Sequence, residues 1–151
     1  MKTLTVRQPW AWAIAKGYKD VENRSRATSH RGPLAIHAGL QWDEPKDLWL
    51  RNAVSIARDQ GHTLPAKLAD DMPYADTGLV LAVVDVVGVC VASRWYPTLQ
   101  CECGPWALPG ETHWRLADAR VLAEPFAAMG RLGLWDVDVP AELLATSGAC
   151  S

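Results

Sequence analysis

Residues 1–26 switch between strand and helix patterns over very short distances, and this punctuation constrains the fold more than any other feature. Leu4 and Val6 alternate with polar neighbours, as in a strand with one buried face. Pro9 follows, then a wholly apolar turn that ends at Gly17. Proline at a first helical position and glycine just past the last one predict a short helix over about 9–16. A helix that is apolar on all sides must be buried, so we expect it to plug one end of a sheet.

A second short strand pattern follows the turn at Gly17 and carries several charges. Period two places Asp20, Glu22 and Arg24 on one face, while Lys19 sits at the turn. These groups suit the binding of a polar ligand, and they suit acid–base chemistry where burial shifts their pKa values.

Charge is distributed unevenly along the chain. Residues 1–31 hold seven basic and two acidic side chains, a net charge of +5, whereas residues 32–151 carry −7. A basic segment of this kind indicates an anionic partner.

An ordered set of motifs gives the first specific clue. They are Leu4 to Ala11 (LTVRQPWA), Gly17-x-Lys19-x-x-Glu22-x-Arg24, Arg31 to Gly39 (RGPLAIHAG), Val83 to Val87, His113-Trp114-x-Leu116, and Pro125 to Trp135. In this order they resemble the ASCH domain, named for activating signal cointegrator homology, over nearly the whole chain. The resemblance implies a relation to PUA domains, which are small β-barrels associated with RNA. It also implies two enzymatic possibilities, because some members hydrolyse acylated cytosine nucleosides and others cleave RNA.

The rest of the chain predicts one domain, 1–151, of the α+β class. We expect a small mixed β-barrel of five or six strands with two or three flanking helices. The expected elements are strands over 33–38, 80–92, 113–124 and 134–139, a helix over 44–60 between Asp43 and Gly61, and a short helix after Pro140. Gly88 predicts a bulge inside its strand, and residues 93–112 predict a long irregular connection.

Membrane and secretory classes are not expected. Residues 79–92 are the most apolar stretch, but they are too short for a span and contain Asp85. The N-terminus lacks a signal-peptide pattern, so we expect a cytoplasmic protein with reduced cysteines.

Cys101-x-Cys103, with Cys90, Cys150 and His113 elsewhere, fits none of the usual paired zinc patterns. Incidental thiols are therefore favoured, and we expect no metal or cofactor.

Asp85 lies in a run of valines, where an ionised carboxylate needs a cation if it is buried. Lys19 and Arg24 are the natural partners, which predicts that all three share one pocket with Glu22. The alternative is that Asp85 lies on the solvated face of an edge strand.

The chain has eight tryptophans and one phenylalanine. Alternation places Trp10, Trp12, Trp114 and Trp135 in the core. Trp95, Tyr96 and Trp106 fall in the long connection, where stacking on a base and ordinary packing are equally open. His37 and His113 are favoured as structural histidines over catalysts.

Two function classes remain open. In the binding class, a basic cleft holds RNA, single-stranded nucleic acid or a modified nucleoside, and Glu22 accepts a hydrogen bond from the exocyclic amine of cytosine. The residues expected to bind are Lys19, Glu22, Arg24, Arg26, Arg31, His37 and Trp95.

In the enzyme class, Lys19 acts as general base or electrostatic stabiliser while Glu22 or Asp85 orients water against the amide of an N4-acylated cytosine. The amidohydrolases resembled here place a threonine where this chain has Glu22, so the obvious nucleophile is missing. A ribonuclease is the weaker alternative, because no dedicated histidine pair or carboxylate cluster stands out. We therefore expect the binding class.

Overall fold

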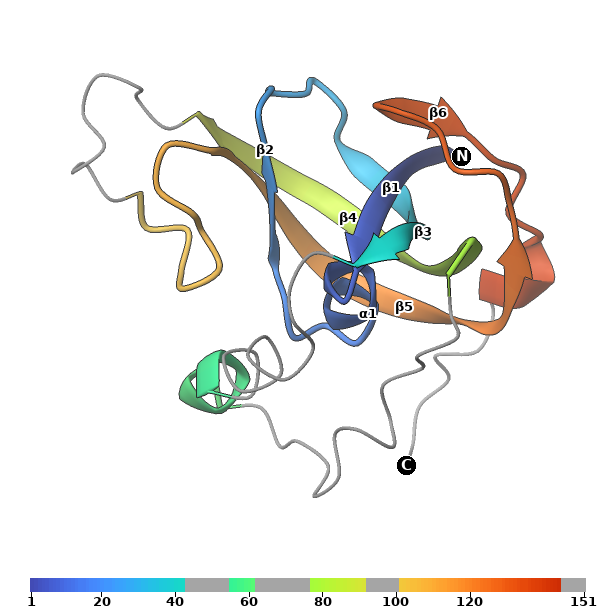
Figure 1. The fold of residues 1–151 in the computed structure, drawn as a ribbon, viewed down its shortest axis with the longest axis horizontal. Coiled ribbons are helices and arrows are strands. Elements are labelled where there is room, and N and C mark those ends of the chain that lie inside the picture. The colour runs from blue at the N-terminus through green and yellow to red at the C-terminus, as the bar shows by residue number, and fades with distance from the viewer. Residues whose placement is uncertain (43–54, 62–76, 92–100, 145–151) are drawn as a thin grey trace.

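The computed structural model describes residues 1–42, 55–61, 77–91 and 101–144. In chain order the elements are β1 (Lys2–Gln8), α1 (Trp10–Ala15), β2 (Val21–Arg24), β3 (Gly32–Trp42), β4 (Leu79–Val91), β5 (Thr112–Ala127), β6 (Leu134–Asp136) and the 3-10 helix η1 (Ala141–Leu144). These six strands form one sheet in the order β2-β5-β4-β3-β1-β6 (Figure 1). The β1–β3 pair is parallel and the others are antiparallel.

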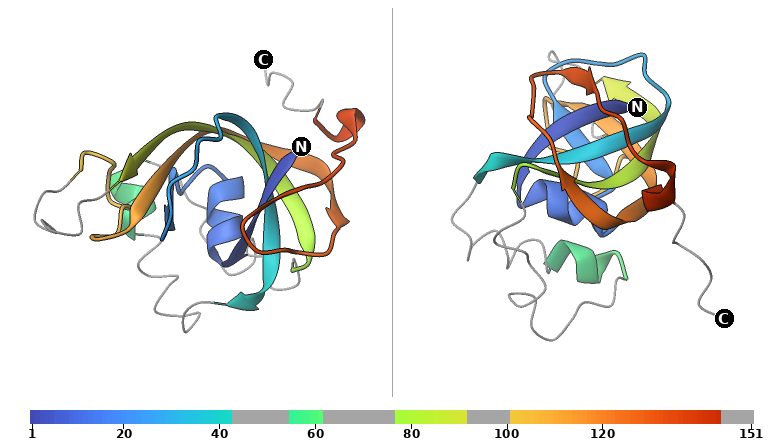
Figure 2. Two further views of the ribbon diagram at one scale, coloured as in Figure 1. Left: turned by 90° about the horizontal axis from the view of Figure 1, so that it is seen from above. Right: turned by 90° about the vertical axis from the view of Figure 1, so that its right-hand side faces the viewer.

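The α+β class is confirmed, but the expected closure into a barrel is wrong. Within the described residues, β2 and β6 lie at opposite edges of the sheet and do not pair with each other. The sheet nevertheless curves strongly around α1 (Figure 2). Three register shifts between β4 and β5 contribute to this bending, and the shift between Val86 and Gly88 confirms the predicted bulge.

The short helix α1 forms where the sequence predicts it. The peptide bond between Gln8 and Pro9 is cis, and the Gln8 side chain accepts a hydrogen bond from the backbone N–H of Trp12 at 3.0 Å. This bond satisfies one of the N–H groups that a helix start leaves unpaired. Gly17 ends the helix with a φ of 73°, a conformation that glycine adopts without strain. Five of the six helical residues are buried, so the helix is held by packing.

The main hydrophobic core lies between α1 and the concave face of the sheet. It includes Leu34, Ile36 and Ala38 of β3, on the face that alternation predicts. A second cluster lies on the other side of the sheet, where Ala35, Val80, Val83 and Leu122 pack under the C-terminal segment. Hydrophobic clusters therefore pack against both faces of the sheet.

Several sequence predictions concern the connections. Residues 55–59 are helical and Gly61 follows with a φ of 80°, whereas Asp43 and most of the predicted 44–60 helix lie outside the described residues. Residues 101–111 form an irregular segment, as predicted. No helix among the described segments is long and apolar enough to cross a membrane.

Candidate functional site

Lys19, Glu22 and Arg24 come together at the start of β2, as the sequence predicts. The Lys19 Nζ donates to Glu22 Oε2 at 3.0 Å and to the carbonyl of Val21. The Arg24 Nη1 lies 3.7 Å from Glu22 Oε1. That separation gives an ion pair but is too long for a hydrogen bond, so Oε1 keeps acceptor capacity.

Burial distinguishes the three charges. The side chains of Lys19 and Glu22 are 4% and 8% exposed, whereas that of Arg24 is 31% exposed. The Lys19 ammonium also lies 5.8 Å from the centre of the Trp10 ring, within the range of a cation–π contact. Lys19 thus fixes the carboxylate of Glu22 from inside the protein.

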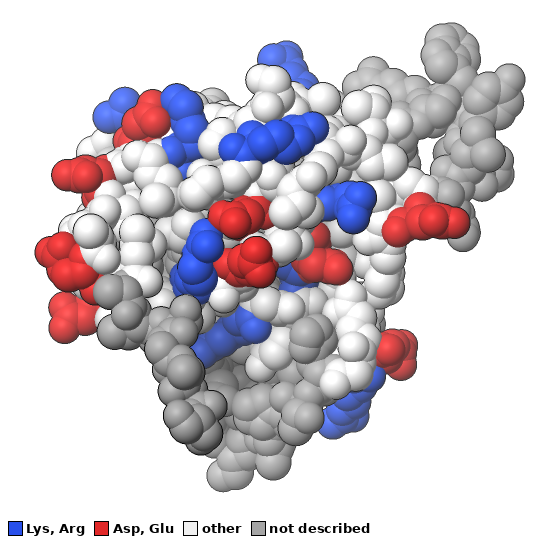
Figure 3. Space-filling model, turned by 180° about the vertical axis from the view of Figure 1, so that it is seen from behind, with Lys and Arg blue, Asp and Glu red and all other residues white. Residues whose placement is uncertain are grey.

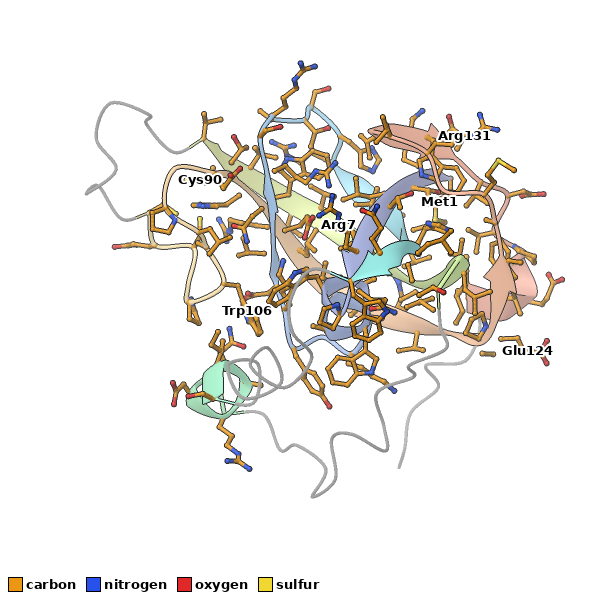
Figure 4. The ribbon with its side chains drawn as sticks, viewed as in Figure 1. Met1, Arg7, Cys90, Trp106, Glu124 and Arg131 are labelled. Atoms are coloured by element: carbon orange, nitrogen blue, oxygen red, sulfur yellow. The ribbon has the colours of Figure 1, made fainter. Side chains whose placement is uncertain are left out.

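Glu22 and Arg24 line a cleft of about 740 Å³, whose other walls come from β1, β3 and residues 128–133. At one end the cleft is lined by Trp10, Glu22, Asn23 and Arg24, and at the other by Thr5, His37, Gly130 and Arg131. Arg7 of β1 also lines the cleft, and Figure 4 shows it near the middle of the molecule while Arg131 projects at the far end. Three arginines from three parts of the chain therefore face one cleft together with a buried carboxylate.

His37 forms the inner wall of the far end of the cleft. Its Nε2–H donates to the carbonyl of Ala128 at 3.0 Å, so its Nδ1 is an acceptor, which has no hydrogen-bond partner among the described residues. Burial lowers the pKa of His37, and the hydrogen bond to Ala128 only partly offsets this. The neutral ring is therefore a buried part of the cleft wall, and Gly130 covers its Nδ1, since a Cβ at position 130 would lie 3.0 Å from that nitrogen.

The segment 130–133 is held against β1 by Thr5. The Thr5 Oγ1 accepts hydrogen bonds from the backbone N–H of Arg131 at 3.3 Å and from the indole of Trp135 at 3.1 Å. Gly130 is required by space here, because a Cβ at this position would lie 2.7 Å from His37 Cε1. These contacts place Arg131 at the mouth of the cleft.

Trp106 has a packing role. It is 4% exposed, its ring meets Trp10 edge-to-face at 6.2 Å, and its indole N–H donates to Gln60 Oε1. Of the residues predicted as core, Trp12, Trp114 and Trp135 are buried, while Trp10 is partly exposed in the cleft. Trp95 and Tyr96 lie outside the described residues.

The predicted pairing of Asp85 with Lys19 or Arg24 is wrong. Its Oδ1 instead accepts a hydrogen bond from Arg120 Nη2 at 2.7 Å. Val84 and Val86 face the core beside α1, so period two turns Asp85 to the other side of the sheet. Asp85 does not line the cleft, and β4 is a central strand, so the edge-strand alternative does not apply either.

Arg26 and Arg31 lie on the exposed connection after β2 and do not line the cleft. Arg31 donates to the carbonyls of Thr28 and His30.

The sequence analysis did not predict Arg7 or Arg131 as site residues, although both lie inside the family motifs. The signal for Arg7 is its position next to buried Val6 in an alternating strand, which turns it away from the core.

A second group of polar side chains lies at the other end of β4 and β5. The ligand atoms of Cys90, Cys101, Cys103 and His113 all lie within 4.8 Å of one another. The sequence favours incidental thiols, and it does not show that strand pairing brings these residues together, with Cys90 and His113 as direct partners across the β4–β5 ladder. Cys150 lies outside the described residues.

Comparison with known protein families matches residues 4–126 to the ASCH domain. The chain belongs to the ASCH domain family. Human activating signal cointegrator 1 is 32% identical over 94 residues, which are 62% of this chain and 15% of that protein. The chain thus corresponds to a small part of this relative. ASCH domains are PUA-like and generally bind RNA.

Charges of both signs are mixed on one face of the molecule. On the face seen in Figure 3, the basic and acidic side chains of the described residues are interspersed. The described residues therefore form no broad basic surface on that face.

Proposed function

We propose that this ASCH domain binds RNA, or a modified nucleoside, by taking one cytosine-type base into the cleft. The observation that carries the proposal is the buried Glu22 carboxylate in the cleft wall, with one oxygen hydrogen-bonded to Lys19 and the other 3.7 Å from Arg24. A carboxylate in this state accepts from an exocyclic amine such as N4 of cytosine. It repels the carbonyl that uracil carries at the same position.

The surroundings of Glu22 support the same ligand class. Trp10 provides an aromatic wall next to the carboxylate, and base stacking on such a wall is worth roughly 1–3 kcal/mol. Arg7, Arg24 and Arg131 line the same cleft, and arginine is a common contact of the phosphate backbone.

Hydrolysis of an N4-acylated cytosine is less favoured by the geometry. Lys19 is buried and donates to two oxygens, so its contacts serve to position Glu22. The Thr5 hydroxyl, which lines the cleft, already accepts from Arg131 and Trp135. Covalent catalysis uses a hydroxyl or thiol that is hydrogen-bonded to a general base. The described cleft residues contain no such pair.

The test compares short oligocytidine and oligouridine RNAs by fluorescence anisotropy. We expect the wild type to prefer oligocytidine by about 1–3 kcal/mol, roughly 5- to 150-fold. Glu22→Gln should remove most of this preference, because an amide both donates and accepts. Glu124→Gln, an exposed site outside the cleft, is the matched control.

Equal affinity for the two RNAs in the wild type would contradict base reading by Glu22. Absence of binding to any RNA or nucleoside would reject the proposed function. Release of acetate from N4-acetylcytidine by the wild type, lost in Lys19→Met while binding is retained, would favour the enzyme class instead.

A further inference from the structure

Three cysteines and one histidine meet where β4 ends and β5 begins, away from the cleft. Cys90 is on β4 and His113 on β5, and the two are opposite each other in the antiparallel ladder. Cys101 and Cys103 come from the irregular segment that leads into β5. Figure 4 shows Cys90 at this end of the sheet. The pairing of β4 with β5 and the fold of the segment before β5 thus bring the four side chains together.

The spacing of the four ligand atoms is close to that of a tetrahedral zinc site. They lie within 4.8 Å of one another, and Cys101 Sγ is 2.9 Å from His113 Nδ1. Zinc–sulfur bonds of about 2.3 Å and zinc–nitrogen bonds of about 2.0–2.1 Å place tetrahedral ligands roughly 3.5–3.8 Å apart. Side-chain shifts of about 1 Å would therefore complete the tetrahedron, with no change in strand pairing.

The orientation of His113 is already that of a metal ligand. Its Nε2 lies 2.7 Å from the carbonyl oxygen of Leu108, and a carbonyl only accepts, so Nε2 carries the hydrogen. In the neutral ring the lone pair then belongs to Nδ1, which faces the three sulfurs. Donation of the second ring N–H to a backbone carbonyl is the usual support for a histidine that binds zinc.

We propose that Cys90, Cys101, Cys103 and His113 bind one zinc ion in a closed structural site. Three thiolates and one imidazole form a donor set that selects zinc, and four protein ligands leave no open position for catalysis. On binding, the three thiols lose their protons to solvent and the site carries a net charge of −1. The charge of nearby Arg115 acts on Cys90 and partly offsets this charge.

The zinc site would hold the segment 101–111 in place, and this segment contacts a residue of the cleft wall, Asn23. This segment carries buried Trp106, and its backbone is bonded twice to the side chain of Asn23 on β2. Asn23 is next to Glu22 and lines the cleft. Loss of the metal should therefore loosen this segment first, while the core around α1 stays folded.

The test measures metal in protein produced without a metal-affinity tag and kept reduced. We expect about one zinc per chain by inductively coupled plasma mass spectrometry. Cobalt added to the metal-free protein should give the intense visible bands of tetrahedral Co²⁺ and a thiolate charge-transfer band in the near ultraviolet. Hydrogen exchange should show faster exchange at the amides of Ala107 and Leu108 after zinc removal. None of these readouts uses RNA, so the outcome is separate from that of the proposed function.

Matched variants assign the ligands. Cys101→Ser and Cys103→Ser should each lower the zinc affinity at least about tenfold. Cys150→Ser, which removes the remaining cysteine of the sequence, should retain it. Wild-type protein that is folded by circular dichroism yet binds neither zinc nor tetrahedral cobalt would overturn the proposal without reference to any variant. Iron–sulfur absorbance, or full zinc affinity in Cys101→Ser, would overturn it as well.

Discussion

Replacing Lys19 with methionine removes the cation that holds Glu22 while keeping a buried side chain of similar length. Breaking a buried ion pair costs about 3–5 kcal/mol, because it leaves one charge without compensation. The Glu22 side chain is 8% exposed, but Arg24 lies 3.7 Å from its other oxygen and partly compensates the charge. We therefore expect Lys19→Met to lower the free energy of unfolding by about 2–3 kcal/mol. For a chain of this length the melting temperature should fall by roughly 4–12 °C.

Urea unfolding followed by tryptophan fluorescence and circular dichroism measures this change. Lys16→Met is the matched control, since Lys16 is exposed at the end of α1 and its change should stay within about 0.5 kcal/mol. Removing both charges in Lys19→Met/Glu22→Leu should recover much of the loss, because a buried pair is often replaceable by apolar groups.

A Lys19→Met variant as stable as the Lys16→Met control would refute this reasoning. It would mean that Glu22 does not carry a buried charge in the folded protein. The fixed acceptor in the cleft, on which base recognition is proposed to depend, would then lose its physical basis.

Salt and pH provide two further tests. In RNA titrations, Arg24→Gln/Arg131→Gln should lower the slope of log K against log salt by roughly 0.7 per lost single-strand phosphate contact. An unchanged slope would show that these arginines are not part of the interface. A lower slope in Arg26→Gln/Arg31→Gln would show that the interface extends to the loop after β2. Burial lowers the pKa of His37 below its ordinary value of 6.5, so the unfolded chain binds its proton first as the pH falls. The free energy of unfolding should therefore decline as the pH drops below 6.5, with a flatter profile in His37→Gln, and identical profiles for the two proteins would contradict this.

Local patterns predicted much of the fold because they depend on neighbouring residues. Pro9 and Gly17 delimit α1, Gly88 marks a bulge, and the spacing of Lys19 and Glu22 brings an ammonium and a carboxylate together around one turn. Each of these features is set by backbone geometry within a few positions. They required no knowledge of which strands pair.

Features that depend on strand pairing could not be predicted in this way. The register of β4 on β5 shifts three times, and this register decides that Asp85 meets Arg120 and that Cys90 meets His113. The failure of the sheet to close has the same origin, because strand order is a property of the whole chain. Arg131 reaches the cleft only because Thr5, far away in the sequence, holds its backbone.

The side chain of Asn23 has a consequence for the edge of the sheet. Its amide donates to the carbonyl of Trp106 at 2.9 Å and accepts from the N–H of Leu108 at 3.0 Å. One side chain thus bonds to the segment 101–111 as a backbone residue of a neighbouring strand would. Because β2 is an end strand that pairs only with β5 among the described strands, these two bonds tie it to a second part of the chain. The amide that borders the cleft therefore also opposes fraying of β2, the strand that carries Glu22.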